Sequence, residues 1–217
     1  MAAFNSFGQF IEKLDAGLQI TLPGDEAHRV MEALSAKYLR LKPDKHTRKS
    51  AVLILLYPCG DKICFPLILR QNYVGFHSAE VSFPGGKYEQ GDKDLVQTAL
   101  REANEEIGLE VDKVHILGTL TDTFIGTSNF MVRPVVGYVY HKPEFLANQG
   151  EVEQIFEVSL DHFTKHRAVV TGEILIPGDR ILTPYYRVEG HKVWGATAKI
   201  INELLHLTGS NTININK

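Results

Sequence analysis

The sequence has few cysteines and no long hydrophobic run. Its 217 residues include only two cysteines, Cys59 and Cys64, which lie in or beside apolar runs and lack the spacing of a metal or redox motif. This usage favours a reduced, cytoplasmic protein, and a single disulfide is the open alternative. No uninterrupted apolar run approaches the ~18 residues of a membrane-spanning helix, so we expect no membrane span.

An excess of basic residues is also missing. The chain carries 23 Lys and Arg against 26 Asp and Glu, a formal net charge of -3. Proteins that bind nucleic acids or acidic membranes are usually basic, so we expect neither partner. An anionic small-molecule substrate would therefore need a local cluster of cations or a metal. The first residues, MAAFNSFGQFIEKLD, lack the basic start and apolar stretch of an export signal, so we expect no export.

Apolar periodicity predicts a helical N-terminal extension. Residues 4–15 and 24–40 have the spacing of amphipathic helices. The expected apolar face of the second helix consists of Val30, Leu34, Tyr38 and Leu39. These helices are expected either to cover a sheet or to contribute to a homodimer interface. We place the extension at residues 1–46, the main domain at 47–210 and a polar tail at 211–217.

After the polar stretch LKPDKHTRK the pattern changes to that of strands. Residues 50–58 and 63–70 flank the turn CGDK and predict two paired strands. Further strands are expected at 114–122, 132–140, 152–160 and over 168–195, with a strand ending in a glycine turn at 81–86 and a last helix at 197–209. Tyr185, Tyr186 and Trp194 could stack on an adenine, but aromatic residues in strands more often belong to the core, so they are not counted as site residues. Short strands with few helices between them predict an α+β layered fold.

One helix, within the stretch FPGGKYEQGDKDLVQTALREANEEIGLE, has clear end signals. Asp94 is expected to cap it, with Gln97 three residues later in a capping-box arrangement. Gly108 is expected to end it in a left-handed conformation. Its apolar stripe consists of Leu95, Ala99, Ala103 and Ile107.

Three acidic residues fall within one turn of this helix. Like charges at this spacing repel by roughly 0.2–0.5 kcal/mol per pair. Glu106 lies about 40° from Glu102 around the helix axis, and Glu105 lies about 60° to the other side. Such a turn taken alone is usually a solvated face. It also presents the oxygen ligands that Mg2+ and Mn2+ prefer, and Arg101 can orient Glu105 from four residues away.

The flanking residues favour the metal interpretation, because the ordered combination resembles the signature of the Nudix hydrolases. The residues that match this signature are Arg101, Glu102, Glu105, Glu106 and Gly108. One extra loop residue places Asp92 near the usual loop glutamate, where a plain turn residue is the alternative. The resemblance implies an α/β/α sandwich around a mixed β-sheet and a catalytic centre of Arg101, Glu102, Glu105 and Glu106, in which the three glutamates bind Mg2+ or Mn2+.

The segment before the helix is similar to the coenzyme A pyrophosphatase branch of that family. Residues at matching positions are Arg70, His77, Phe83, Pro84, Gly85 and Gly86. Two positions depart from the branch, with Gly75 in place of a second Arg and Ala79 in place of a Gly. A second Arg would suit the 3′-phosphate of coenzyme A. The candidate substrate-binding residues are Arg70, His77, Gly85, Gly86 and Lys87, with Arg133 as a further phosphate partner.

The resemblance implies attack by a metal-activated water on a pyrophosphate bond. For coenzyme A the products would be 4′-phosphopantetheine and adenosine 3′,5′-bisphosphate. Glu151 is the candidate for a further catalytic carboxylate outside the helix, acting as ligand or base, with Glu153 in reserve. Two alternatives stay open: the same chemistry on another nucleoside diphosphate derivative such as ADP-ribose, and a non-catalytic module that senses a nucleotide.

Overall fold

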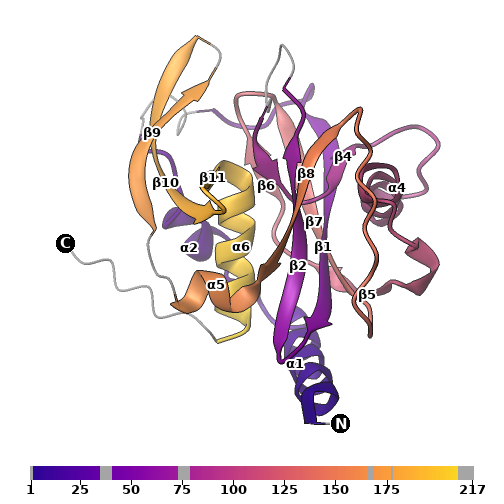
Figure 1. Ribbon diagram of the computed structural model, residues 1–217. Helices are drawn as coiled ribbons and strands as arrows, with labels where there is room; N and C mark the ends of the chain where they lie inside the picture. The colour runs from indigo at the N-terminus through magenta and orange to yellow at the C-terminus, as the bar shows by residue number, and fades with distance from the viewer. Residues whose placement is uncertain (1, 35–40, 73–78, 166–168, 177, 210–217) are drawn as a thin grey trace.

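The fold consists of a large mixed sheet, a smaller sheet and helices on both sides of the large one (Figure 1). The computed structural model describes residues 2–34, 41–72, 79–165, 169–176 and 178–209. The helices are α1 (Ala2–Leu18), α2 (Gly24–Arg29), α4 (Leu95–Ile107), the 3-10 helix η1 (Val111–Lys113), α5 (Leu160–Lys165) and α6 (Gly195–Leu207). The strands are β1 (Arg48–Cys59), β2 (Lys62–Arg70), β3 (Val81–Ser82), β4 (Gly85–Lys87), β5 (His115–Thr119), β6 (Thr123–Ile125), β7 (Phe130–Tyr138), β8 (Val152–Ser159), β9 (Val170–Ile176), β10 (Asp179–Val188) and β11 (His191–Trp194).

Strand β1 is the centre of the eight-stranded sheet, whose main path is β3-β2-β1-β7-β5. It runs parallel to β7 and antiparallel to β2 and β4. Strand β6 adds to β7, and β8 adds to β2. The second sheet has the order β11-β10-β9. The sheet is therefore mixed, as predicted, and the strands expected from the sequence are present.

Both faces of the large sheet are covered, which explains why β1 is an almost continuous apolar run. On one face, Leu53 and Leu55 pack with Ala99 and Ala103 of α4. On the other face, Ile54 and Leu56 belong to the cluster that contains the buried residues of α6. Helix α4 lies to the right of the sheet in Figure 1 and α6 to its left. These layers confirm the predicted α+β fold, an α/β/α sandwich.

The first predicted helix is confirmed, and it covers the sheet. Helix α1 buries Phe7, Ile11 and Leu14 in the same cluster as the residues of α6. Their spacing of four and three residues places them on one helical face. Among the described residues, no helix is long and apolar enough to cross a membrane.

The second predicted helix, at 24–40, is wrong in its extent. Helix α2 ends at Arg29. The N–H groups of Met31 and Glu32 then donate to carbonyl oxygens three residues earlier, as in turns and not as in an α-helix. The N–H of Leu34 then donates to the carbonyl oxygen of Leu182 in β10 at 2.9 Å. Leu34 is 60% exposed, so it is not part of an apolar helical face. Pairing with β10 outweighs the local periodicity, and residues 35–40 lie outside the described part of the chain.

The expected glycine turn at 85–86 is a strand. Gly85 pairs with Val52, and Gly86 pairs with Ala51, so β4 extends the sheet beside β1. A Cβ atom on Gly85 would collide with the backbone of β1 at Ala51 and Val52, and the φ angle of Gly85 is +154°. Only glycine allows this close approach, which brings β4 under helix α4.

Candidate active site

Helix α4 has the ends that the sequence predicts. The Asp94 carboxylate accepts a hydrogen bond from the Gln97 N–H at 2.9 Å, and Gly108 has a φ angle of 66°. The Gln97 side chain accepts a hydrogen bond from the Lys93 N–H at 2.6 Å. A capping box would instead use the N–H of the cap residue, Asp94. Ala99, Ala103 and Ile107 are fully buried, which fixes the rotation of the helix. The acidic turn is therefore held in one orientation, over β4.

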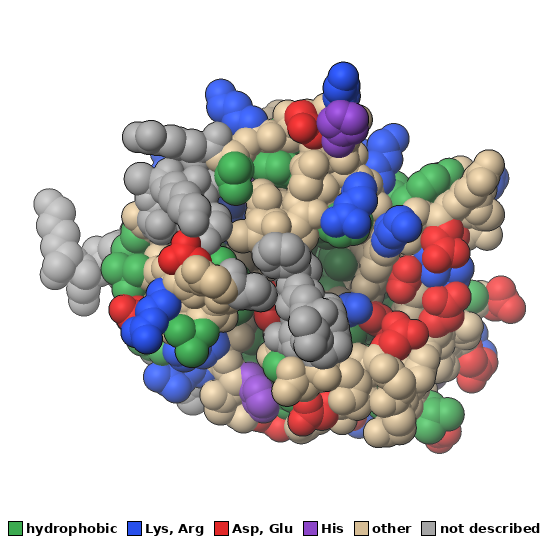
Figure 2. Space-filling model, turned by 90° about the horizontal axis from the view of Figure 1, so that it is seen from above, with side chains coloured by type: hydrophobic (Ala, Val, Ile, Leu, Met, Phe, Trp, Pro, Cys, Tyr) green, Lys and Arg blue, Asp and Glu red, His purple; other side chains and the backbone are tan. Residues whose placement is uncertain are grey.

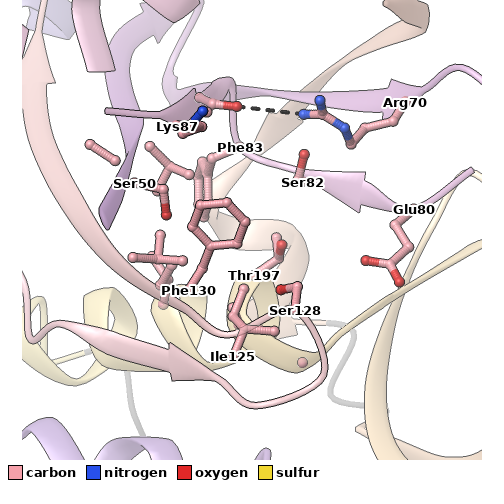
Figure 3. A pocket seen from close by; sticks show the side chains of 18 of the residues that line it. Ser50, Arg70, Glu80, Ser82, Phe83, Lys87, Ile125, Ser128, Phe130 and Thr197 are labelled. Carbon is pink, nitrogen blue, oxygen red and sulfur yellow. Dashed lines mark hydrogen bonds between the residues drawn. The ribbon is translucent and has the colours of Figure 1, made fainter. Parts of the chain in front are cut away.

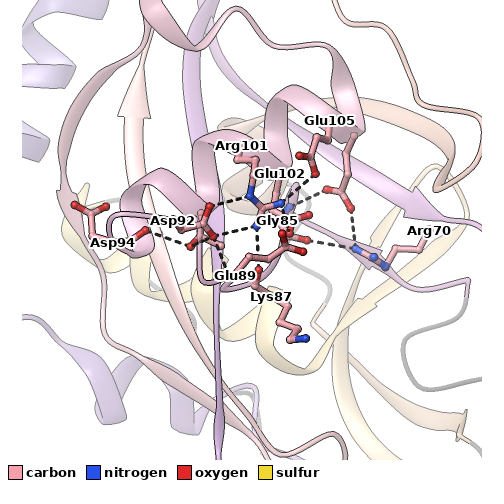
Figure 4. Close-up of polar contacts among 11 residues, drawn as sticks. Arg70, Gly85, Lys87, Glu89, Asp92, Asp94, Arg101, Glu102 and Glu105 are labelled. Carbon is pink, nitrogen blue, oxygen red and sulfur yellow. Dashed lines mark hydrogen bonds and ion pairs between the residues drawn. The ribbon is translucent and has the colours of Figure 1, made fainter.

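Arg101 organises the polar side of this helix (Figure 4). Its Nη1 atom donates to Glu102 at 3.0 Å and to Glu105 at 3.1 Å, so the predicted contact with Glu105 is present. Its Nη2 atom also donates to the backbone carbonyl of Lys87 at 3.0 Å. One guanidinium thus ties two of the acidic side chains to the end of β4.

Asp92 holds Arg101 in place. Its carboxylate accepts from Nε of Arg101 at 2.9 Å and from Nη2 at 3.1 Å. It also accepts from the Thr98 hydroxyl at 2.8 Å and from the Glu89 N–H at 3.0 Å. The hydrogen bonds from Arg101, opposed by burial, lower the pKa of Asp92 well below its usual range. Asp92 is therefore a buried anchor for Arg101, a role that the signature spacing alone did not indicate.

Glu106 is the most deeply buried of the acidic residues. Its side chain is 0% exposed and accepts from the Gly85 N–H at 2.8 Å and from Arg70 at 3.0 Å. Burial raises the pKa of Glu106 to about 7, although Arg70 and the Gly85 N–H favour the charged form. Burial also raises the pKa of Glu102, against the opposing effect of Arg101. The side chain of Glu105 is 48% exposed.

Gly86 lies directly under the carboxylate of Glu102. A Cβ atom at this position would come within 2.5 Å of all three atoms of that carboxylate group. Gly86 does not have a positive φ angle, so its missing side chain serves the close approach and not the backbone conformation. The bare backbone leaves open the space next to the acidic turn.

Glu151 immediately precedes β8, beside the end of β2. Its carbonyl oxygen accepts from the Gln71 N–H at 2.9 Å, next to Arg70. The charge of Glu151 raises the pKa of both Glu102 and Glu106. Four carboxylates, from α4 and from the opposite edge of the site, therefore share one electrostatic environment.

The donor set suits a hard divalent cation. Buried carboxylates that raise one another's pKa are stabilised by a positive ion, and Mg2+ and Mn2+ prefer oxygen ligands. As the side chains stand, no group of three or more His, Cys, Asp or Glu in the described part of the chain is gathered around one point. Arg70 and Arg101 instead occupy oxygens of Glu106, Glu102 and Glu105.

A cavity of about 400 Å3 adjoins the acidic turn through Gly85 and Gly86 (Figure 3). It is lined by the predicted substrate-binding residues Arg70, Gly85, Gly86 and Lys87. Its apolar wall consists of Val52, Phe83, Ile125, Phe130, Val132, Trp194 and Ile200. The Ser82 hydroxyl oxygen is buried, and within the described residues it has no hydrogen-bond partner. Seen from above, the molecule is hollowed beside basic side chains (Figure 2).

Some predicted residues lie elsewhere. His77 and Gly75 fall outside the described residues. Arg133 binds both carboxylate oxygens of Asp122, at 2.9 and 2.7 Å, and is not among the residues that line the cavity. Tyr185 and Tyr186 are buried in the core as predicted, each 4% exposed.

Part of the cavity wall consists of residues that were not predicted from the sequence. Trp194, which was left out of the predicted site, is partly buried and lines the cavity. Arg48 and Phe130 were not considered, yet both line the cavity. The signal that could have found them is their place at the start of strands β1 and β7, which pair at Arg48 and Phe130.

Known proteins resemble this chain over most of its length. The profile of the NUDIX domain matches residues 47–175. "Nudix hydrolase 15, mitochondrial" from Arabidopsis thaliana is 38% identical over 170 residues, which make up 75% of this chain and 58% of that protein, less than two thirds of its length. "Uncharacterized Nudix hydrolase NudL" from Yersinia enterocolitica is 34% identical over 161 residues, 73% of this chain and 80% of that protein.

A solved structure agrees in fold. The Nudix hydrolase RenU from M. smegmatis has a TM-score of 0.54 at 16% identity, over 79% of this chain and 91% of that chain. This likeness supports the architecture, and the profile and the two relatives support the family. This chain belongs to the Nudix hydrolase family.

Proposed function

We propose that this chain hydrolyses the diphosphate bond of coenzyme A or its derivatives with Mg2+ or Mn2+, giving 4′-phosphopantetheine and adenosine 3′,5′-bisphosphate. The observation that carries the reaction class is the acidic turn of α4, which faces the Gly85–Gly86 strand at the edge of a cavity. A diphosphate is strongly anionic, so binding it beside buried carboxylates requires cations.

Each residue of the site has a physical role in this proposal. Glu102, Glu105 and Glu106 hold the divalent ion. When bound, such an ion neutralises phosphate charge and lowers the pKa of a coordinated water. Arg101 is a positioning residue that orients the glutamates and is itself fixed by Asp92.

Further roles belong to groups around the glutamates. Arg70 lies 3.0 Å from Glu106 and lines the cavity, so its guanidinium can also contact a phosphate there. Gly85, Gly86 and Lys87 form the neighbouring edge of the cavity, and His77 is retained as a candidate substrate contact. We assign Glu151 the role of further ligand or base, because its charge acts on Glu102 and Glu106.

Coenzyme A is proposed as substrate on two grounds. The segment from Arg70 to Gly86 is similar to that of the coenzyme A pyrophosphatase branch. The cavity next to the acidic turn has the mainly apolar lining that an uncharged part of such a substrate requires. The same chemistry on ADP-ribose is the second candidate, because Gly75 replaces the second Arg of the branch. A non-catalytic sensor is the third, and the intact set of glutamates argues against it.

The remaining predictions about the chain are kept as proposals. A main domain from residue 47 is supported by the start of the profile match at that residue. The contribution of the N-terminal helices to a homodimer stays a prediction. A cytoplasmic location also stays a prediction, whereas the name of the Arabidopsis relative describes that protein as mitochondrial.

The experiment is product analysis by mass after incubation with Mg2+ or Mn2+ and a mixture of coenzyme A, dephospho-coenzyme A, acetyl-coenzyme A, ADP-ribose, NADH and nucleoside triphosphates. Preferential release of adenosine 3′,5′-bisphosphate is expected, with loss of turnover in EDTA and recovery on adding metal. Preferential cleavage of ADP-ribose or NADH would replace the proposed substrate. Binding of one compound without cleavage would favour the sensor.

A further inference from the structure

Two basic side chains lie on one wall of the cavity, apart from the acidic turn. Lys87 of β4 pairs with Ser50 of β1, so their side chains lie on the same face. Arg48 lies two residues before Ser50 and therefore shares this face. All three line the cavity. We call Arg48 and Lys87 the basic pair.

The basic pair is not neutralised by the protein. Among the described residues, neither Arg48 nor Lys87 forms an ion pair. Glu80 also lines the cavity, on the wall opposite Ser50 and Lys87 (Figure 3). The side of the cavity near the basic pair is therefore positive, and it suits an anionic group of a ligand.

Arg48 is held in a fixed orientation. Its guanidinium carbon lies 4.0 Å from the centre of the Phe130 ring, and its Nη2 atom donates to the Ser128 carbonyl oxygen at 2.8 Å. A guanidinium has five N–H donors, so most remain available to a ligand. A planar, preorganised Arg is suited to a phosphate, and the more mobile Lys87 adds a second charge.

Arg48 is too far along the sheet to serve the same phosphates as the acidic turn, whereas Lys87 directly follows Gly86. Gly86, which lies under Glu102, pairs with Ala51. Arg48 lies three residues from Ala51 along β1, about 10 Å at the usual rise of a strand. Apolar rings, including Phe83 and Phe130, line the cavity between Arg48 and the glycines Gly85 and Gly86 beside the acidic turn. This arrangement fits a ligand with a diphosphate at one end of a ring system and a separate phosphate at the other.

We infer that Arg48 and Lys87 bind a phosphate monoester on the nucleoside of the substrate, separate from the diphosphate that is cleaved. This inference rests on the proposed function and deepens it. It supplies, from different residues, the phosphate contact that Gly75 does not provide. The substrate class is therefore a nucleoside diphosphate derivative that carries an additional ribose phosphate.

The first test is the ratio of kcat/KM for coenzyme A to that for dephospho-coenzyme A, which lacks the ribose phosphate. The wild-type chain is expected to prefer coenzyme A. Because a hydrogen bond to a charged group contributes about 1.5–3 kcal/mol, Arg48→Met and Lys87→Met should each lower the ratio by roughly tenfold or more. Lys93→Met and Arg180→Met, outside the cavity lining, should keep the wild-type ratio. No preference in the wild type, or an equal loss for both substrates in the variants, would overturn the inference.

The second test separates this inference from the proposed reaction. Calorimetry on the full chain would compare binding of adenosine 3′,5′-bisphosphate with binding of AMP. Preference for the bisphosphate that is lost in Lys87→Met supports the basic pair, even if no hydrolysis is found. Hydrolysis of coenzyme A with a bisphosphate preference unchanged in both variants would refute the pair and leave the reaction standing. Within the described residues Lys87 has no ion pair to lose, so its substitution is not expected to disturb folding.

Discussion

Replacing Glu106 by glutamine should stabilise the metal-free chain at alkaline pH. The pKa of Glu106 is raised from 4.5 to about 7 by burial, so the ionised carboxylate is disfavoured in the folded state. The protonated form of Glu106 contributes favourably to the free energy of unfolding. This contribution is fully present below pH 4.5 and is lost as pH rises through about 7. A shift of that size corresponds to about 3 kcal/mol, which glutamine avoids because it stays neutral.

The assay is thermal unfolding in EDTA between pH 4.5 and pH 8. For a chain of this length, about 3 kcal/mol corresponds to a rise in Tm of about 6–12 °C for Glu106→Gln at pH 8. The difference between variant and wild type should shrink towards pH 4.5, because both side chains are then neutral. Mg2+ should stabilise the wild type more than the variant, because the ion offsets the buried charge. Turnover of the variant should be lost at every pH.

Glu105→Gln is the matched control. It changes the same residue type on the same turn, but the Glu105 side chain is 48% exposed. Its effect on stability should stay within about 0.5 kcal/mol at all pH values. A Glu106→Gln variant that is less stable than wild type at pH 8, or a Tm difference that does not change with pH, would refute the account of the buried carboxylate.

Three further substitutions test the parts of the site. Asp92→Asn should lower the free energy of unfolding by about 1.5–3 kcal/mol in a urea titration, because it weakens the buried bonds to Arg101; a change below about 0.5 kcal/mol would contradict the anchor role. Gly86→Ala should lower kcat by roughly 100-fold by displacing the Glu102 carboxylate. Unchanged turnover would show that the close packing of Gly86 against Glu102 does not matter for activity. Glu151→Gln should lower kcat by about 100-fold or more if Glu151 is the base, and wild-type turnover would remove it from the mechanism.

The site helix could be predicted almost completely from the sequence. Its signals are local: Asp94 as cap, Gly108 as left-handed terminus and an apolar stripe that fixes which face is exposed. The three glutamates follow from 100° per residue once that face is known. The strands on either side were equally clear, because central strands that are buried on both faces read as continuous apolar runs.

The features that were predicted wrongly or not at all depend on contacts between segments that are distant in the sequence. The helix expected over 24–40 ends at Arg29, because Leu34 pairs with β10, and local periodicity carries no information about that pairing. The cavity wall was missed for the same reason. Arg48 and Phe130 are brought together by the parallel pairing of β1 with β7, across 82 residues of chain. Asp92 was expected at most as a loop acid, and only the fold shows that it is buried against Arg101.

The most direct test of the central claim is a titration with Mn2+ followed by electron paramagnetic resonance, comparing the wild type with Glu106→Gln. The account predicts that the wild-type chain binds Mn2+ and that the variant binds it at least tenfold more weakly, as expected when a ligand is lost. Equal affinity in the two proteins would contradict the claim that the acidic turn of α4 holds the divalent ion.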